Sequence, residues 1–479
     1  MVPARKLLKN YIMLFAGNVL GQSFFFLGFV QLARVLGPSG FGVWNFAQVC
    51  MLYLLRVGEF GLEVIGLRET ARDPKIVSSW IANVVSVRFV LAMFLFGFAV
   101  LLSVLNLLPS GTTSLVVITS LCVFPMAFLL EWVFEARQEV GLISIARILK
   151  GVLFFLAVLF LISRSEDATL AAYLYVISLT LPSVMILSIV INRFGFAWSS
   201  LSIRSAMDAL HKSAPIGISS LLSQYCLSAA PLMVGYFLSM ENLGYFTAAH
   251  RIVLFMWAYI LTSMHRILLP SLSTYFRESL IHYTRFVEKF FRLSALFAVP
   301  IGLVGTLCAL PLMTLLFTAK YESSGMVFAI IIWAFVFASI RSILEIALIA
   351  SDRQRRFMIG TVFLAVMYTI FIPILTLKFG IIGASVAMVL SELCYFVYLI
   401  LTFPFLKSVT LIKNTWKPIF AAIISMILFL PLGELHPVLR MVFSSIIFGI
   451  IIIGLKGVTL ADWELIKATI NRERVKQPI

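Results

Sequence analysis

Long apolar stretches, separated by short polar segments, follow one another along almost the whole chain. Runs such as Phe89–Leu108 and Met441–Leu455 contain no charged residue and no polar face. A hydrocarbon core about 30 Å thick needs about 20 apolar residues per helix, and about fourteen stretches reach or approach that length. The alternating pattern of a membrane β-barrel is absent. The pattern therefore predicts an all-α integral membrane protein.

The predicted transmembrane helices are bounded by the short polar segments. They are 11–33, 43–66, 81–105, 114–134, 144–163, 169–191, 214–238, 250–272, 290–317, 326–349, 357–377, 381–403, 417–432 and 437–455. The last two are shorter than the others. No soluble domain is predicted between or after these spans, so function must be carried out inside a membrane or at its two faces.

Composition agrees with this prediction. The chain is 61% hydrophobic and 12% charged, whereas soluble domains carry about 25% charged residues. The five cysteines are dispersed and lie inside predicted spans, without the spacing of a metal site. We therefore expect no metal, no cofactor and no catalytic residue. The apolar stretch after Asn10 is too long for a cleavable signal peptide, so the first span is expected to be retained.

The net charge of +16 has a topological explanation. Cytoplasmic loops of membrane proteins are enriched in Lys and Arg, and the basic clusters alternate in step with the predicted spans. If the N-terminus is cytoplasmic, that side holds Arg5, Lys6, Lys9, Arg68, Arg72, Lys75, Arg137, Arg147, Lys150, Arg193, Arg204, Lys212, Arg277, Arg285, Lys289, Arg292, Arg353, Arg355, Arg356, Lys407, Lys413, Lys417 and the basic tail. Only scattered cations, such as Arg34 and Arg164, fall on the other side.

This alternation predicts a multi-pass protein of the cell (inner or plasma) membrane with both termini in the cytoplasm. The excess positive charge would favour contact with anionic lipid headgroups. Nucleic acid is not expected as a partner.

An internal repeat organises the spans. Segment 36–47 (LGPSGFGVWNFA) resembles segment 238–249 (LSMENLGYFTAA), with Gly42 matching Gly244 and Ala47 matching Ala249. Each segment follows the first helix of a six-helix block and opens the second. An even number of spans separates the copies, so both blocks have the same orientation, as in parallel transporter repeats.

The repeat predicts two pseudo-symmetric six-helix lobes followed by two C-terminal helices. The predicted division is 1–192 for the first lobe, 193–213 for a cytoplasmic loop, 214–405 for the second lobe, 406–456 for the last two helices and 457–479 for a basic tail.

Several segments resemble the polysaccharide transporter family of the multidrug/oligosaccharidyl-lipid/polysaccharide exporter superfamily, which includes the Wzx-type O-antigen flippases. The resemblance covers roughly residues 8–405. Its matching segments are Arg34–Gly42, Gly58–Leu62 with Arg68-Glu69, Glu131–Phe134, Leu243–Arg251 and Lys378–Ala384. It implies a fold like that of multidrug exporters of this superfamily and the translocation of a lipid-linked oligosaccharide. A polysaccharide polymerase complex is a candidate partner.

Two positions depart from the family pattern. The family often carries an Asp in its seventh helix, where this chain has Ala229–Met233, and Glu59 stands where Asp is more usual. If that Asp takes part in coupling or substrate contact in other members, this chain must do so differently.

Ionisable residues inside predicted spans are the candidate functional groups, because each costs at least about 2.5–3.5 kcal/mol to insert. Candidates for substrate binding are Arg56, Arg88, Arg251, Arg266 and Arg341, and candidates for ion coupling are Glu59, Glu63, Glu345 and Glu392.

Two interpretations of these groups remain open. In the first, the arginines line a cleft and bind the diphosphate of a polyprenyl-pyrophosphate-linked sugar, since a guanidinium binds phosphate oxygens bidentately. The carboxylates would then couple transport to a proton or sodium gradient. In the second, Arg56–Glu59 and Arg341–Glu345 neutralise each other within one helix, and Glu63, Arg88 and Arg251 extend toward an interface.

Other function classes fit the sequence less well. An ATP-driven pump needs a phosphate-binding loop, and no GxxxxGK[ST] is present. A membrane glycan polymerase usually needs a sizeable external loop, whereas the predicted external segments, such as 106–113 and 164–168, are short. A multidrug exporter of the same superfamily would have a smaller and more apolar binding cleft, whereas the many arginines inside the predicted spans favour an anionic substrate. The resemblance to the polysaccharide transporter family implies a flippase for O-antigen or another surface polysaccharide unit. We expect it to work by alternating access, with a lipid II flippase as the nearest alternative.

Overall fold

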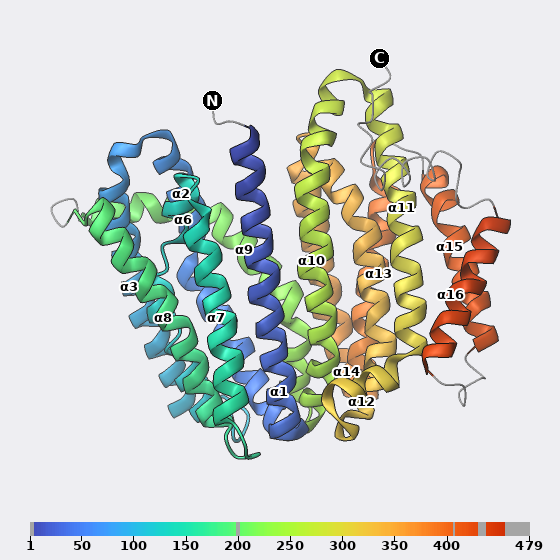
Figure 1. The fold of residues 1–479 in the computed structure, drawn as a ribbon, viewed down its shortest axis with the longest axis horizontal. Coiled ribbons are helices and arrows are strands. Elements are labelled where there is room, and N and C mark those ends of the chain that lie inside the picture. Colours follow the sequence, from blue (N-terminus) through green and yellow to red (C-terminus); the bar gives the residue numbers. More distant parts are fainter. Residues whose placement is uncertain (1–3, 198–201, 406–407, 430–436, 456–479) are drawn as a thin grey trace. The chain divides into compact units, whose positions relative to one another are not determined.

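The computed structural model describes residues 4–197, 202–405, 408–429 and 437–455. Within these ranges the chain is helical almost throughout and contains no strand, which confirms the all-α membrane fold (Figure 1). The first half contains α1 (Ala4–Glu59), α2 (Leu62–Arg72), η1 (Pro74–Ile76), α3 (Val77–Val104), α4 (Thr113–Ser120), α5 (Val123–Ala127), α6 (Glu131–Ala136), α7 (Val140–Leu161), α8 (Ala168–Phe194) and α9 (Ile203–Phe237). The second contains α10 (Met240–Glu278), α11 (Leu280–Leu307), α12 (Ala309–Phe317), η3 (Ala319–Tyr321), α13 (Ser323–Ala350), α14 (Gln354–Thr402), α15 (Ser408–Phe429) and α16 (Pro437–Gly454).

Nine helical segments of the described chain are long and apolar enough to cross a membrane. Two of them, Met13–Arg72 with 60 residues and Gln354–Thr402 with 49, are long enough for two crossings each at about 1.5 Å per residue. The predicted C-terminal spans are the helices α15 and α16, whose described apolar parts are shorter. The protein is therefore a multi-pass membrane protein.

The bends within α1 and α14 occur at glycines. Gly37 has a φ of 68° and Gly380 a φ of 61°, both in the left-handed region that glycine adopts without a steric penalty. Each bend lies between two predicted spans, so each of these long helices corresponds to two of them.

The predicted span 114–134 is the most irregular. It consists of three short helices, α4, α5 and α6, instead of one continuous helix. Pro125 lies within α5 and has no backbone N–H to donate, which favours an interruption here.

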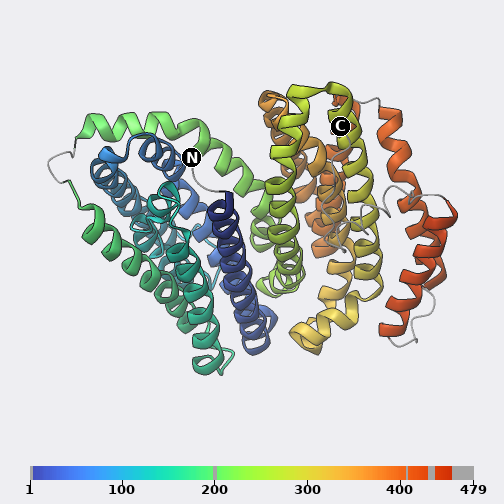
Figure 2. The same cartoon turned by 45° about the horizontal axis from the view of Figure 1, so that its top comes forward.

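The segment 203–213, predicted as part of a cytoplasmic loop, is the start of the helix α9. Its apolar residues Ala206, Ala209 and Leu210 pack on the core of neighbouring helices, while Asp208 and Lys212 are exposed and form an ion pair at 2.7 Å. Figure 2 shows this first part of α9 crossing over α2 and α3, both of which α9 contacts. The segment is a helix and not the predicted loop because its apolar and polar residues alternate with the helical period, which gives the helix one buried and one exposed face.

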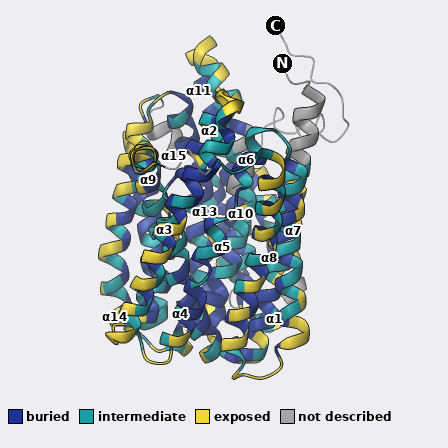
Figure 3. Cartoon of the chain, turned by 90° about the vertical axis from the view of Figure 1, so that its left-hand side faces the viewer, coloured by how far each residue is buried: buried dark blue, intermediate teal, exposed yellow. Residues whose placement is uncertain are grey.

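The packing of the chain defines two compact units. Unit 1 comprises 1–255, 313–327 and 361–391, and unit 2 comprises 256–312, 328–360 and 392–479. In unit 1, exposed apolar residues follow the surface of α3, including Val90, Phe94 and Val104, as a lipid-facing surface requires (Figure 3). In unit 2, α15 packs on α11 and α16.

The division into six-helix lobes stays a prediction. Residues 198–201 of the predicted inter-lobe loop, residues 430–432 of one predicted span and the predicted basic tail lie outside the described residues.

The backbones of α1 and α7 approach each other closely at glycines. A Cβ added to Gly21 would lie 2.6 Å from the carbonyl oxygen of Arg147, and one added to Gly151 would lie 2.2 Å from the carbonyl oxygen of Gly21. Gly17, four residues before Gly21, meets Ser144 in the same way. Small residues spaced by four allow close helix packing in membranes, where polar and van der Waals contacts hold helices together.

We predict that Gly151→Ala destabilises the protein by about 1–3 kcal/mol, because the added methyl group cannot avoid the backbone of α1. Gly97→Ala in α3 is the control, since no atom lies within 4 Å of its added Cβ. This control should be neutral or stabilising, because Ala favours a helix over Gly by about 1 kcal/mol. Thermal unfolding in detergent measures both. Equal melting temperatures for the two variants would contradict the close packing.

Candidate functional site

A cavity inside unit 1 is built by the facing surfaces of α1 and α7. Asn18, Gln22 and Phe25 lie at i, i+4 and i+7 on α1, which places them on one face of the helix. Arg147 and Lys150 lie one turn apart on α7 and line the same cavity. Because the glycines bring the two backbones together, these polar side chains are held close to one another.

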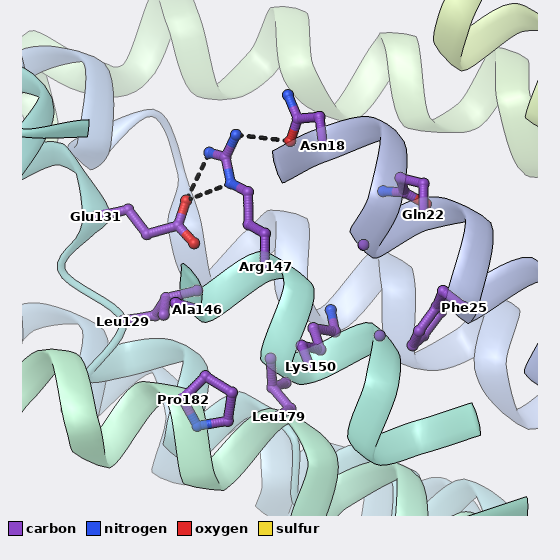
Figure 4. Close-up of a pocket in the computed structure, with 12 residues that line it drawn as sticks. Asn18, Gln22, Phe25, Leu129, Glu131, Ala146, Arg147, Lys150, Leu179 and Pro182 are labelled. Atoms are coloured by element: carbon purple, nitrogen blue, oxygen red, sulfur yellow. Dashed lines mark hydrogen bonds and ion pairs between the residues drawn. The ribbon is translucent and has the colours of Figure 1, made fainter. Parts of the chain in front are cut away.

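The cavity has a volume of about 270 Å³. Residues from α1, α6, α7 and α8 contribute to its wall, as Figure 4 shows. The complete lining is Asn18, Gly21, Gln22, Phe25, Leu129, Glu131, Ala146, Arg147, Lys150, Gly151, Leu179 and Pro182.

Arg147 is fixed by hydrogen bonds on two sides. Its Nε and Nη2 donate to Oε2 of Glu131 at 3.0 and 2.6 Å, and its Nη1 donates to Oδ1 of Asn18 at 2.8 Å (Figure 4). Oε1 of Glu135 lies 3.6 Å from Nη2 of Arg147. The guanidinium is thus oriented and largely neutralised by its surroundings.

Lys150 differs from Arg147 in its partners. Its Nζ lies 5.2 Å from the ring centroid of Phe25 and 6.0 Å from that of Tyr175. Among the residues that the structure describes, no ion pair joins Lys150 to a carboxylate. Lys150 is ten residues into α7, or about 15 Å from the start of the helix. An ammonium that lies over aromatic faces in the wall of a cavity can bind an anion that enters it.

Arg147 and Lys150 are not among the site residues predicted from sequence. Arg147 and Lys150 were counted among the charges of the cytoplasmic side, although both lie inside the predicted span 144–163. The rule that selected the other candidates, an ionisable residue within a span, would have selected these two as well. Arg147 and Lys150 escape this rule because the enrichment of cytoplasmic segments in Lys and Arg already accounts for both residues.

Arg251 lies elsewhere in unit 1, on α10. Its Nη2 donates to Oδ1 of the buried Asn45 at 2.7 Å, and its Cζ lies 3.9 Å from the ring centroid of Phe29. Phe29 in turn packs on Trp44 and Phe154. The Arg251 guanidinium is thus held inside the helix bundle by an amide and an aromatic ring.

Two of the predicted groups form a pair within α1. Nη1 of Arg56 lies 2.9 Å from Oε2 of Glu59, and Nε of Arg56 lies 3.4 Å from Oε1 of Gln224 on α9. The Arg56 side chain is 46% exposed, so this pair is open to its surroundings.

Arg88 and Glu63 form a pair between α3 and α2. Nη2 of Arg88 lies 3.2 Å from Oε1 of Glu63, and Nη1 donates to the carbonyl of Leu129 at 3.3 Å. The Arg88 side chain is only 2% exposed, whereas Glu63 is 27% exposed. This arginine joins two helices and lies away from the surface.

Unit 2 contains a cluster in which one arginine meets two carboxylates. Nη1 of Arg341 lies 2.5 Å from Oε1 of Glu345, and its Nε donates to Oε2 of Glu392 at 2.7 Å. The Cζ of Arg341 lies 4.6 Å from the ring centroid of Tyr395. Glu345 and Glu392 thus approach the same guanidinium from α13 and α14. Arg266 belongs to α10, but its side chain lies outside the described residues.

No group of three or more His, Cys, Asp or Glu side chains in the described part of the chain could hold a metal ion.

We predict that Arg88→Met destabilises the protein by about 2–3 kcal/mol, because it leaves Glu63 without its cation. This is below the cost for a fully buried pair, because Glu63 is partly exposed. The double variant Arg88→Met/Glu63→Gln should regain most of the loss. Arg68→Met, at a pair whose arginine is 49% exposed, is the control and should change stability by less than about 1 kcal/mol. Denaturation in detergent measures the free energy of unfolding of the wild type, the two single variants and the double variant. If the losses of the single variants simply add in the double variant, the pairing of Arg88 with Glu63 is contradicted.

The chain resembles known proteins both in sequence and in fold. A protein of Escherichia coli (strain K12) named "Putative O-antigen transporter" is 22% identical over 232 residues, which are 47% of this chain and 55% of that protein. The chain thus spans about half the length of the curated relative that it matches.

Two solved structures illustrate the fold. A lipid II flippase, MurJ, in an inward closed conformation is 15% identical, with a TM-score of 0.72 over 93% of this chain and 98% of that chain. A multidrug resistance MATE family transporter of the MOP superfamily, in an inward-facing conformation, is also 15% identical. Its TM-score is 0.64, and the match covers 79% of this chain and 93% of that chain. At this identity the two structures establish the fold alone.

Residues 7–276, more than half of the chain, match a family described as "Polysaccharide biosynthesis protein". The match contains the cavity between α1 and α7 and both copies of the internal repeat. The chain belongs to the polysaccharide biosynthesis protein family.

Proposed function

We propose that this protein is a flippase that moves a polyprenyl-pyrophosphate-linked oligosaccharide, a unit of O-antigen or another surface polysaccharide, from the cytoplasmic to the external leaflet. The observation that carries the proposal is the family match over residues 7–276. The relative named as an O-antigen transporter and the fold shared with a lipid II flippase support it.

The cavity of unit 1 supports an anionic substrate. Its ionisable wall residues are two cations, Arg147 and Lys150, and one carboxylate, Glu131. Since Glu131 bonds to Arg147, the Lys150 ammonium is the group with charge left to offer a phosphate oxygen. Asn18 and Gln22 add amide groups at the same wall. Of the arginines predicted from sequence, Arg56 is proposed to contact the substrate as well, because its side chain is 46% exposed.

Lipid II is the second candidate substrate, because it carries the same pyrophosphate and differs in its sugars. The family match favours a surface polysaccharide unit. A multidrug exporter remains an alternative within the same fold, and the two cations Arg147 and Lys150 in the cavity wall favour an anionic substrate over it. We propose transport and not catalysis, since the connections at 162–167 and 238–239 are too short to hold a catalytic loop.

We propose alternating access of the two six-helix lobes as the mechanism, with both termini in the cytoplasm. Under this orientation the bend of α1 at Gly37 lies at the external face. The predicted partner is a polysaccharide polymerase complex that would take up the released lipid-linked unit.

Coupling to a proton or sodium gradient is proposed for Glu345 and Glu392. The support is geometric: both carboxylates contact the same guanidinium, so binding of a proton or a small cation at either one changes the charge beside Arg341. Glu59 and Glu63 each have an arginine of their own and are weaker candidates.

We predict that Lys150→Met abolishes export of the surface polysaccharide, because the cavity loses its unpaired cation. Lys150→Arg should retain part of the activity, since it keeps the charge. Surface glycan and the cytoplasmic pool of its lipid-linked unit are measured in cells that produce each variant. For Lys150→Met we expect loss of surface glycan and accumulation of the lipid-linked unit in the cytoplasmic pool.

Lys212→Met serves as the matched control, since Lys212 is an exposed cation paired with Asp208 on α9. It should leave export unchanged. Normal export by Lys150→Met, at a wild-type level of protein in the membrane, would disprove the role of the cavity.

We predict that Glu345→Gln uncouples transport from the ion gradient while the protein still inserts normally. Arg341 keeps Glu392 as its partner, so the variant leaves no unpaired charge. Uptake of the lipid-linked unit in vesicles with and without an imposed proton or sodium gradient measures the coupling. The wild type should respond to one of these gradients and the variant to neither. An unchanged response would exclude this cluster from coupling.

A further inference from the structure

Two turns related by the internal repeat touch each other in unit 1. The register that matches Gly42 with Gly244 also matches Pro38 with Met240. In the structure, Gly42 meets the backbone of Met240, and Gly244 meets the backbone of Pro38. The contact therefore repeats itself about a local pseudo-twofold axis.

The approach is too close for any side chain. A Cβ added to Gly42 would lie 1.7 Å from the carbonyl oxygen of Met240, and one added to Gly244 would lie 1.9 Å from the carbonyl oxygen of Pro38. In each glycine a hydrogen occupies this position and points at the oxygen, which is the geometry of a weak Cα–H···O contact. Because the obstacle is backbone, a larger residue could not be accommodated by a change of rotamer.

The residues next to the glycines keep the same symmetry. Nδ2 of Asn45 donates to the carbonyl of Phe41 at 2.7 Å, and Oγ1 of the matching Thr247 donates to the carbonyl of Leu243 at 2.7 Å. Phe41 and Leu243 are fully buried. The layer beside the glycines is thus closed to water.

A third segment closes the same end. Oη of Tyr321 donates to the carbonyl of Ala33 at 2.9 Å. Nε and Nη2 of Arg34 donate to the carbonyls of Leu316 and Leu315 at 2.7 and 2.6 Å. These bonds hold residues 315–321 against the bend of α1, so a third segment packs beside the two turns of the repeat.

We infer that the contact of Gly42 and Gly244 is a latch, which closes one end of the substrate path and separates once in each transport cycle. This inference rests on the proposed flippase function. The two glycine backbones can part without breaking an ion pair and can return to the same position. Their separation also requires that Arg251 release Asn45, to which it donates a hydrogen bond. The repeat supplies both halves of the latch, which explains why both copies carry glycine at this place.

Thiol labelling tests the latch without a transport assay. The reporter is Ala248→Cys, because Ala248 is fully buried and lies one turn beyond Gly244 on the same face. The full-length chain is purified in detergent, and a water-soluble maleimide is counted at this position by mass spectrometry. We expect Gly42→Ala and Gly244→Ala each to speed labelling about tenfold, a shift of ~1.4 kcal/mol toward the open state. The double variant should label no faster than either single variant.

Gly97→Ala is the matched control, since its added Cβ meets no atom within 4 Å, and it should leave the labelling rate unchanged. Equal rates for the latch variants and the control would disprove the latch, even if the protein proves to be a flippase. Faster labelling would support it even in a protein that moves a different lipid.

A second experiment does not depend on how glycine variants fold. Ser39 and Glu241 are exposed, occupy matching positions of the repeat and flank the contact. A reducible cross-linker between Ser39→Cys and Glu241→Cys should stop transport of the lipid-linked unit in vesicles, and reduction should restore it. Transport at the wild-type rate by the cross-linked protein would contradict a contact that must open.

Discussion

Pairing of charge away from water is the constraint on which the arrangement of these helices depends. A carboxylate or guanidinium in a low-dielectric interior is costly unless a partner neutralises it. Arg88 therefore joins α3 to Glu63 on α2, and Arg341 joins α13 to Glu392 on α14. Each of these pairs connects two consecutive α-helices of the chain. Two cations of the described residues are exceptions: Arg251 contacts the amide of Asn45 and the ring of Phe29, and Lys150 lies over the rings of Phe25 and Tyr175. Because Lys150 lines a cavity, we assign it to binding rather than to stability.

Glycine contacts set the distances at which these charges meet. Gly21 and Gly151 bring α1 and α7 together, which places Asn18 within hydrogen-bond reach of Arg147. The same backbone chemistry serves another purpose at Gly42, where the contact joins two copies of a repeat. A close glycine contact therefore holds the cavity between α1 and α7 in a fixed shape, and by our inference a similar contact at Gly42 and Gly244 can open.

Much of the fold could be predicted from sequence, because a bilayer enforces long apolar helices. The bends at Gly37 and Gly380 also fall between predicted spans. The partners of the charges could not be predicted, since periodicity places Arg341 and Glu345 on one face but says nothing about Glu392 on another helix. Lys150 was misjudged for a related reason: the charge pattern of loops explained it before its depth in α7 was known.

Reconstitution tests the central claim most directly. The purified protein is placed in vesicles that contain a fluorescent polyprenyl-pyrophosphate-linked oligosaccharide, and a membrane-impermeant quencher reports how much of it reaches the outer leaflet. Our account predicts that the wild-type protein makes the inner-leaflet pool accessible to the quencher and that this accessibility is lost when the pyrophosphate is replaced by a neutral linkage. Equal movement of the neutral lipid, or no movement of the pyrophosphate lipid, would contradict it.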